Sequence, residues 1–174
     1  TTLLKLITGM IMPTSGKILC NNINMDEINV DTLHSRIGFV MQENALFNTT
    51  LKENLLYGDM NANDEEIFEA CRKAYLSDFI DSLPDGLETI IGERGIKLSG
   101  GQCQRLVLAR LFLKSPDIYI FDEATSHLDP QGETFIHDAL RNIDSDNIII
   151  VVSHRKSSLN LCNKRFSVEK GTFI

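Results

Sequence analysis

Three short apolar runs constrain the fold of this 174-residue chain more than any other feature. They cover residues 37–40, 118–121 and 148–152, and they consist mainly of β-branched and aromatic residues. Strands that are apolar along their whole length are typical of a parallel sheet that helices cover on both faces. We therefore expect an α/β fold with a parallel sheet at its centre.

Helical patterns lie between these runs. Residues 102–114 follow Ser99-Gly100-Gly101 and precede Ser115-Pro116. In a helix they would be apolar on almost every face, which predicts a buried helix with a glycine-rich start. Asp129-Pro130 supplies an N-cap and a proline for the first helical position. The apolar stripe that follows predicts an amphipathic helix; its residues are Phe135, Ile136, Ala139, Leu140 and Ile143.

Two further regions complete the organisation of the chain. Residues 50–95 contain acidic helical patterns over 63–75 and 77–83, followed by a turn at 83–86, and are interpreted as a helical insertion. Residues 16–20 and the following Asn21-Asn22 predict a strand and tight turn of a small antiparallel sheet. His34 is placed in a loop and His137 in a helix, and neither is assigned a role.

Composition limits the classes of partner. A net charge of −7 and a pI near 5.0 argue against a general nucleic-acid or anionic-lipid surface, because the overall field repels polyanions. No apolar run approaches the roughly 20 residues of a membrane-spanning helix. The scattered cysteines form no C-x-x-C pair, which favours reduced thiols in a cytosolic setting over disulfides or zinc; they are Cys20, Cys71, Cys103 and Cys162.

Polar side chains follow each of the three predicted strands. Gln42 comes after the first, Asp122-Glu123 after the second and Ser153-His154 after the third. Ligands of open α/β sheets bind beyond the carboxyl ends of the strands. One such residue alone is more often an ordinary loop residue, whereas three at one sheet edge predict a binding site.

The adjacent carboxylates Asp122 and Glu123 suit two different duties. Hard cations such as Mg²⁺ prefer carboxylate oxygens, which favours Asp122 as a metal ligand, direct or through water. Glu123, one residue further, is then the candidate general base for an attacking water. The alternative is that both carboxylates cap the helix that follows.

Residues 98–102, Leu-Ser-Gly-Gly-Gln, place two glycines at the start of a predicted helix. Free N–H groups and the positive end of the helix dipole make such a start an anion site. The alternative is a loop whose glycines serve tight packing. The following Gln104-Arg105 and the helix leading into the Asp122-Glu123 strand favour the anion site.

These motifs, in this order and spacing, resemble those of the ATP-binding cassette (ABC) ATPases. Residues 98–102 resemble the signature motif and residues 118–123 the Walker B strand with its catalytic Glu123. Gln42 falls at the Q-loop, residues 126–129 at the D-loop and His154 at the H-loop. Residues 1–7 resemble the end of a Walker A motif and its helix. The chain is then a fragment cut within Walker A, without the lysine and glycines of that motif, and the fragment alone is expected to be inactive as an ATPase.

The resemblance implies a P-loop NTPase (RecA-like) parallel sheet core, a small antiparallel β part and a helical subdomain. The expected boundaries are about 1–48 and 106–174 for the core and about 49–105 for the helical subdomain. The implied cofactors are ATP and Mg²⁺. The implied metal ligands are Thr1, Gln42 and Asp122, and the implied catalytic residues are Glu123, His154 and Gln42. The implied nucleotide contacts are Thr1, Thr2, Gln42, Ser99, Gly100, Gly101, Gln102, Asp122, Asp129 and His154.

Two such domains are expected to pair head to tail, so that Ser99, Gly100 and Gly101 contact the partner's ATP and Asp129 links the two sites.

Residues 47–54 and 91–95 resemble exporter sequences, and the latter resembles the X-loop that touches the coupling helices of a transmembrane domain. The expected function is ATP hydrolysis that powers export, at the cytoplasmic face of a membrane and with no nucleic-acid partner. The alternatives are a soluble ABC ATPase acting on DNA or ribosomes and a degenerate regulatory cassette. Two residues depart from the family pattern: Cys103 stands where a basic residue is common, and His127 stands where the D-loop usually has a small residue. Because of His127, the resemblance does not fix the detailed geometry with which the D-loops cross in the dimer.

Overall fold

The computed structural model describes residues 2–41, 45–92, 95–124, 130–169 and 172–173, and the account below refers to these residues. The helices are α1 (Thr2–Ile7), α2 (Val30–Ser35), α3 (Leu51–Leu56), α4 (Asp64–Lys73), α5 (Ser77–Asp81), α6 (Gly100–Lys114), α7 (Pro130–Arg141) and α8 (Lys156–Leu159), with 3-10 turns at Met25–Glu27 and Gly86–Glu88. The strands are β1 (Leu19–Cys20), β2 (Ile23–Asn24), β3 (Ile37–Val40), β4 (Ile118–Asp122), β5 (Ile148–Val152), β6 (Val168–Glu169) and β7 (Thr172–Phe173).

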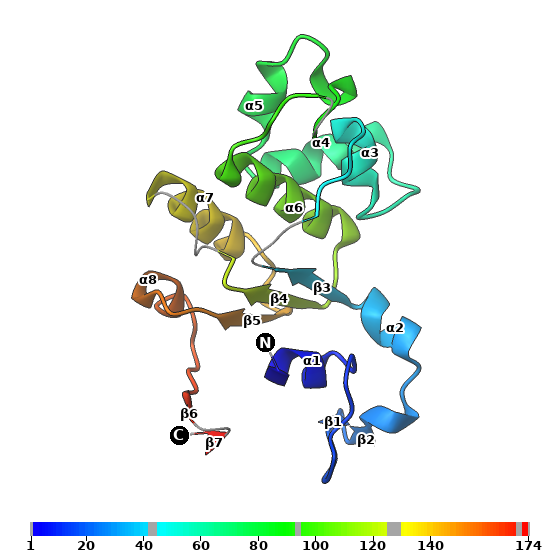
Figure 1. The fold of residues 1–174 in the computed structure, drawn as a ribbon, viewed down its shortest axis with the longest axis vertical. Helices are drawn as coiled ribbons and strands as arrows, with labels where there is room; N and C mark the ends of the chain where they lie inside the picture. Colours follow the sequence, from blue (N-terminus) through cyan, green and yellow to red (C-terminus); the bar gives the residue numbers. More distant parts are fainter. Residues whose placement is uncertain (1, 42–44, 93–94, 125–129, 170–171, 174) are drawn as a thin grey trace.

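The predicted parallel sheet is confirmed. Strands β3, β4 and β5 lie side by side in that order, all parallel, as Figure 1 shows. Val40 is aligned with Phe121, which in turn is aligned with Val151. The three strands therefore end together, and the residues that follow them meet at one edge of the sheet.

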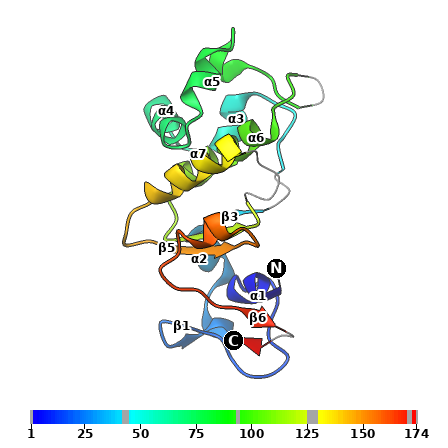
Figure 2. The same cartoon turned by 90° about the vertical axis from the view of Figure 1, so that its left-hand side faces the viewer.

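Alternate residues of β4 enter two different hydrophobic cores. Tyr119 and Phe121 pack into the core shared with α3 to α7, whereas Ile120 packs with Leu4 and Leu33 beneath the sheet. This alternation follows from the period of two in a strand. Figures 1 and 2 show the sheet between the layer of α3 to α7 and the part that contains α1 and α2.

One expectation about the sheet is wrong in part. Strand β5 was expected to be buried on both faces, but Ile148 is 56% exposed and Ile149 is 37% exposed. Among the described strands, β5 pairs with β4 alone, so it lies at an edge of this sheet. An apolar run therefore predicts the strand itself, but not how completely its neighbours cover it.

Helix α6 confirms the predicted long helix and begins two residues earlier, at Gly100. Ser99 is its N-cap: the Ser99 hydroxyl accepts a hydrogen bond from the Gln102 N–H, and the Gln102 side chain accepts one from the Ser99 N–H. This reciprocal capping box satisfies two of the free donors at a helix start. The helix ends at Ser115, whose φ of 48° is left-handed.

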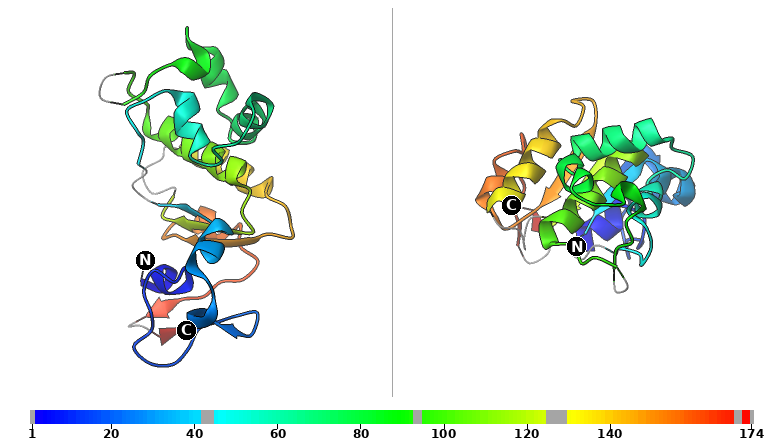
Figure 3. Two further views of the ribbon diagram at one scale, coloured as in Figure 1. Left: turned by 90° about the vertical axis from the view of Figure 1, so that its right-hand side faces the viewer. Right: turned by 90° about the horizontal axis from the view of Figure 1, so that it is seen from above.

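The remaining layer above the sheet consists of α3, α4 and α5 (Figure 3, right panel). Helices α3 and α4 pack against α6, whereas α5 packs against α4 and the 3-10 turn at Gly86–Glu88. Thr50 and Asn63 cap α3 and α4 with the same reciprocal hydrogen bonds. The helical patterns predicted for 63–75 and 77–83 are confirmed as α4 and α5. The proposed division at 49–105 stays a prediction, and α6 passes through its second boundary.

The small antiparallel part is also confirmed, with a shorter first strand than expected. Asn21 and Asn22 both have positive φ, 49° and 65°, which is the conformation of a type I′ hairpin turn between β1 and β2. The placement of His34 in a loop is wrong, because His34 lies in α2. Asn29 caps that helix by accepting a hydrogen bond from the Thr32 N–H, and this start signal was overlooked.

Two further predictions concern α7 and the thiols. Helix α7 begins at Pro130, and Ile136, Ala139 and Leu140 of its apolar stripe are buried. All four cysteines are free thiols. Within the described ranges, no helix combines the length and the hydrophobicity that crossing a membrane requires.

Candidate functional site

Two of the predicted catalytic side chains meet at the carboxyl edge of the sheet. His154 Nε2 lies 3.4 Å from Glu123 Oε1. The register explains this proximity, because Asp122 is aligned with Val152 and each side chain comes shortly after the end of its strand. The Glu123 side chain is 31% exposed and that of His154 is 91% exposed, so both remain accessible to a ligand from solvent.

The backbone at Glu123 adopts a left-handed conformation with φ of 53°. Such a conformation costs a non-glycine residue about 1–3 kcal/mol and is found where surrounding contacts fix it, often at functional sites. Here the Glu123 N–H donates a hydrogen bond of 2.9 Å to the Val152 carbonyl. The chain thus turns sharply at Glu123, directly beyond Asp122.

A buried glutamine links this turn to helix α6. The Gln104 amide donates a hydrogen bond to the Ala124 carbonyl, and the Gln104 residue is only 7% exposed. Gln104 is not among the predicted site residues. The available signal was a polar amide inside a helix that is otherwise mainly apolar, since a buried polar group needs a specific partner.

Of the two glycines at the start of α6, Gly100 is exposed and Gly101 is half-buried. A Cβ atom added at Gly100 or Gly101 would meet no other atom within 4 Å. Neither glycine has a positive φ. The alternative explanation, that these glycines serve tight packing within the chain, is therefore wrong for the described residues. Glycine also lowers helix stability relative to alanine, so its presence twice in this first turn is not explained by the fold of this chain.

Two helix starts face the side of the molecule on which the parallel strands end. In Figure 1 the strands point to the left, and the N-terminal ends of α1 and α6 lie on the same side, below and above the sheet. Thr2 is the first residue of α1 and is exposed. Free N–H groups at helix starts attract anions such as phosphate.

Several predicted site residues lie outside the described ranges. They are Thr1, Gln42, Asp129, the remainder of the 126–129 segment, Glu93 and Arg94. Of the others, the structure brings Glu123 and His154 into contact and places Asp122 beside them in the chain. Ser99, Gly100, Gly101 and Gln102 form the exposed start of α6.

A charged cluster beside the His154 segment was not predicted. Glu133 Oε2 accepts a hydrogen bond of 2.6 Å from Arg155 Nη1, and Glu133 Oε1 accepts one from the Ser157 hydroxyl. His137 Nε2 lies 3.6 Å from Glu133 Oε1. The Ser157 hydrogen bond, followed by the Arg155 contact, holds the pKa of Glu133 below its usual range despite partial burial. Burial lowers the pKa of His137.

The residues at the strand ends fit a metal that enters with a phosphate ligand. No group of three or more His, Cys, Asp or Glu side chains suited to hold a metal alone is found in the described part of the chain. Mg²⁺ commonly uses one or two carboxylates together with substrate phosphates and waters. Asp122 at the end of β4 is compatible with that arrangement.

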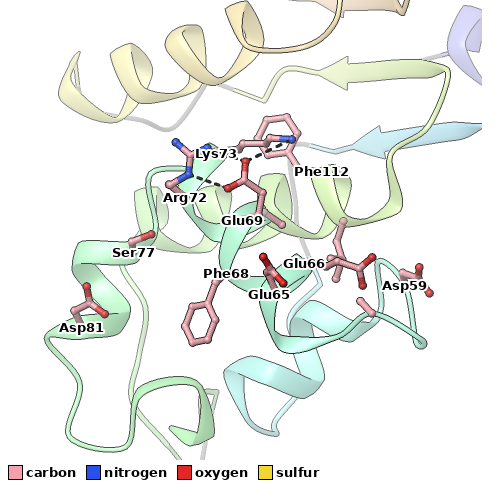
Figure 4. Close-up of a pocket in the computed structure, with 13 residues that line it drawn as sticks. Asp59, Glu65, Glu66, Phe68, Glu69, Arg72, Lys73, Ser77, Asp81 and Phe112 are labelled. Carbon is pink, nitrogen blue, oxygen red and sulfur yellow. Dashed lines mark hydrogen bonds and ion pairs between the residues drawn. The ribbon is translucent and has the colours of Figure 1, made fainter.

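A groove of about 800 Å³ lies elsewhere, between α4, α5 and the end of α6. Figure 4 shows its mixed lining, in which Glu69 contacts Arg72 and Lys73. None of the predicted site residues lines this groove. It is distinct from the site at the strand ends.

Comparisons with known proteins agree with these motifs. The family model described as ABC transporter matches residues 1–126. A protein of Staphylococcus aureus strain NCTC 8325, named as a multidrug export ATP-binding/permease protein, is 44% identical over 173 residues, which are 99% of this chain and 30% of that protein. The counterpart in strain COL gives the same values. This chain thus spans about 30% of the length of these relatives.

A solved structure extends the similarity to three dimensions. The structure of a bacterial Atm1-family ABC exporter with ATP bound has a TM-score of 0.83 and 37% sequence identity, over 91% of this chain and 28% of that chain. The predicted α/β fold and the resemblance stated from the motifs are confirmed. The family is one of ATP-binding proteins, which implies that the chain binds a nucleotide. By its sequence match and its fold, this chain belongs to the ABC transporter family, as an ABC-type ATPase domain.

Proposed function

We propose that this chain binds and hydrolyses ATP and that hydrolysis powers export across a membrane. The contact between Glu123 and His154 at the carboxyl edge of the sheet carries the proposal, because it places a carboxylate and an imidazole beside each other at the expected position of the reacting phosphate. The names of the relatives, which join ATP binding to a permease and to multidrug export, support the second part.

In the hydrolysis step, Glu123 accepts a proton from the attacking water. Its carboxylate is accessible, and its left-handed backbone directs the chain away from β4 just beyond Asp122. His154 donates a hydrogen bond to the γ-phosphate and is itself oriented by Glu123. Proton acceptance of this kind contributes on the order of 10²–10⁴ in rate.

Asp122, together with Thr1 and Gln42, would hold Mg²⁺ when nucleotide binds. The ion supplies positive charge that offsets the charge of the phosphate oxygens. Thr2 lies at the start of α1, where free N–H groups favour the phosphates. Gln42 senses the metal and the nucleotide.

The start of α6 serves the ATP held by a second ABC domain. Ser99, Gly100 and Gly101 are exposed or half-exposed, and the glycines leave space that no atom of the described residues fills. An anion brought by a partner can therefore approach the free N–H groups closely. Gln102 holds Ser99 in place through the capping box, and Asp129 connects the two ATP sites of the dimer.

The coupling to transport uses the segment before α6. Glu93 and Arg94 would contact the coupling helices of a transmembrane domain, and the ATPase would lie on the cytoplasmic face of the membrane. No nucleic-acid partner is expected, because the net charge of −7 opposes a polyanion surface.

The test compares ATP binding and ATP hydrolysis in the full-length protein and in its His154→Ala variant. We expect the variant to bind ATP but to lose most of its hydrolysis. His34→Gln is the control, since His34 contacts the Thr8 carbonyl far from the strand ends. A wild-type protein without ATP hydrolysis would contradict the enzymatic proposal and favour a regulatory cassette. A protein that hydrolyses ATP but does not sediment with membranes would favour a soluble ABC ATPase.

A further inference from the structure

We propose that Glu133 is a positioning residue for His154. Glu133 fixes the chain immediately after His154 to helix α7, and so couples the catalytic histidine to the helix that begins next to Asp129. This inference rests on the proposed role of His154 at the phosphate. It adds a residue that the motifs of the family do not include.

The carboxylate of Glu133 uses both of its oxygens on the segment after His154. Oε2 accepts a hydrogen bond of 2.6 Å from Arg155 Nη1, and Oε1 accepts one from the Ser157 hydroxyl. The Arg155 contact spans 22 positions in the sequence, and the Ser157 contact spans 24. These contacts therefore join two separate elements, α7 and the loop that leads into α8.

The cluster lies in a partly buried position, which strengthens its interactions. The Glu133 side chain is 15% exposed and that of Arg155 is 34% exposed, whereas exposed pairs such as Arg141 with Asp138 have 64% and 37% exposure. Exposed ion pairs contribute little to stability because water and salt screen them. Charge-assisted hydrogen bonds in a partly buried site are stronger.

A second contact supports the same arrangement. His137, one turn after Glu133, has its Nε2 atom 3.3 Å from the Ser158 hydroxyl, and Ser158 is only 2% exposed. Residues 155–158 therefore contact one face of α7 through several polar groups. The segment cannot shift without breaking them together.

His154 depends on such anchoring because its own side chain is 91% exposed. It lies between the end of β5 at Val152 and the anchored Arg155. A displacement of about 1 Å in a catalytic group can lower a rate on the order of 10²-fold. Release of the Arg155 end would therefore affect His154 directly, while the strand would remain in place.

The experiment uses the full-length protein and the Glu133→Gln variant, which keeps the side-chain size but removes the charge. We expect faster amide hydrogen exchange over residues 153–158 and turnover reduced on the order of 10- to 10²-fold, with ATP affinity changed less than threefold. Asp138→Asn is the matched control on the same helix, because the Asp138 carboxylate forms an exposed ion pair with Arg141 and no hydrogen bond to Arg155 or Ser157 is found among the described residues. The control variant should change neither the amide hydrogen exchange over residues 153–158 nor the turnover.

A double-mutant cycle separates positioning from a general structural role. If Glu133 acts through His154, Glu133→Gln should lower turnover in the wild-type background and cause no further loss in the His154→Ala background. An equal loss in both backgrounds, or unchanged exchange over 153–158, would overturn the inference. Should Glu133→Gln fail to fold, Ser157→Ala takes its place, because it removes one of the two contacts of Glu133. The same changes in hydrogen exchange and turnover are then expected. If His154→Ala alone leaves turnover intact, the proposed function fails instead.

Discussion

His154 Nε2 and Glu123 Oε1 lie 3.4 Å apart, although the two residues belong to different strand ends of the sheet. Parallel pairing of β4 with β5, in the register of Asp122 with Val152, brings them together. The register of the parallel sheet thus accounts for the approach of the proposed catalytic carboxylate to the histidine.

The hydrogen bond from the Gln104 amide to the Ala124 carbonyl should stabilise the fold, so we expect its removal to lower stability. Gln104→Met keeps the side-chain length but leaves a buried carbonyl without this partner. An unsatisfied buried group costs about 1–3 kcal/mol, and we expect this decrease in the free energy of unfolding by chemical denaturation. ATP turnover should fall as well, because the turn at Glu123 is no longer held to α6. Unchanged stability would mean that water replaces the amide at no cost.

The open start of α6 predicts that a bulky cation at position 99 prevents pairing of two domains. Ser99→Arg replaces the N-cap and fills the space that Gly100 and Gly101 leave free. We expect ATP-dependent dimerisation to be lost in analytical ultracentrifugation of the full-length protein, with monomer folding largely kept. A variant that still dimerises and hydrolyses ATP normally would exclude a role for this segment in the partner's ATP site.

The charged cluster at Glu133 predicts a specific dependence of stability on pH. The Ser157 hydrogen bond and the neighbouring Arg155 hold the pKa of the Glu133 carboxyl below its ordinary value of 4.5. The resulting stabilisation is fully present above pH 4.5 and is lost as the pH falls through the lower pKa of the folded state. His137 adds an acid-side loss of its own, because burial lowers its pKa and disfavours protonation in the folded state.

The measurement for this prediction is the free energy of unfolding of wild type and Glu133→Gln between pH 7 and pH 3. Their difference should be largest at pH 7 and should shrink below pH 4.5. Because the Glu133 carboxylate favours the protonated form of His137, both proteins are compared in a His137→Gln background, which removes that contribution from the difference. A difference that grows on acidification would show that Glu133 is protonated more readily in the folded state.

The sequence predicted the sheet and α6 closely because their signals are local. Uninterrupted apolar runs mark β3, β4 and β5, and Ser99 with Gln102 marks the start of α6. Helix α2 was missed because it is only six residues long and buries just Leu33. The N-cap residue Asn29 was the stronger sequence signal for this helix.

The site was predictable only where residues follow a strand or begin a helix. The sequence predicted that His154 and Glu123 lie at the same sheet edge, whereas their direct approach follows from the strand order β3-β4-β5, which the structure supplies. The left-handed backbone at Glu123 leaves no trace in the sequence, since glutamate rarely adopts it. The contacts of Glu133 with Arg155 and Ser157 join distant positions without any local pattern, so the structure was needed to find them.

The adjacent residues Asp122 and Glu123 should differ when each is replaced in the full-length protein. Asp122→Asn would remove the carboxylate proposed as a ligand of Mg²⁺, so binding of Mg²⁺-ATP itself should weaken. Glu123→Gln keeps the shape of the side chain but cannot accept the proton of the attacking water. It should therefore bind ATP and hold the dimer with little hydrolysis.

The most direct test of the account measures ATP affinity and steady-state hydrolysis together for wild type and Glu123→Gln. A lost general base predicts turnover lower by on the order of 10²–10⁴ with nearly unchanged affinity. Near-normal hydrolysis by Glu123→Gln would contradict the assignment of Glu123 as the base, and with it the central claim.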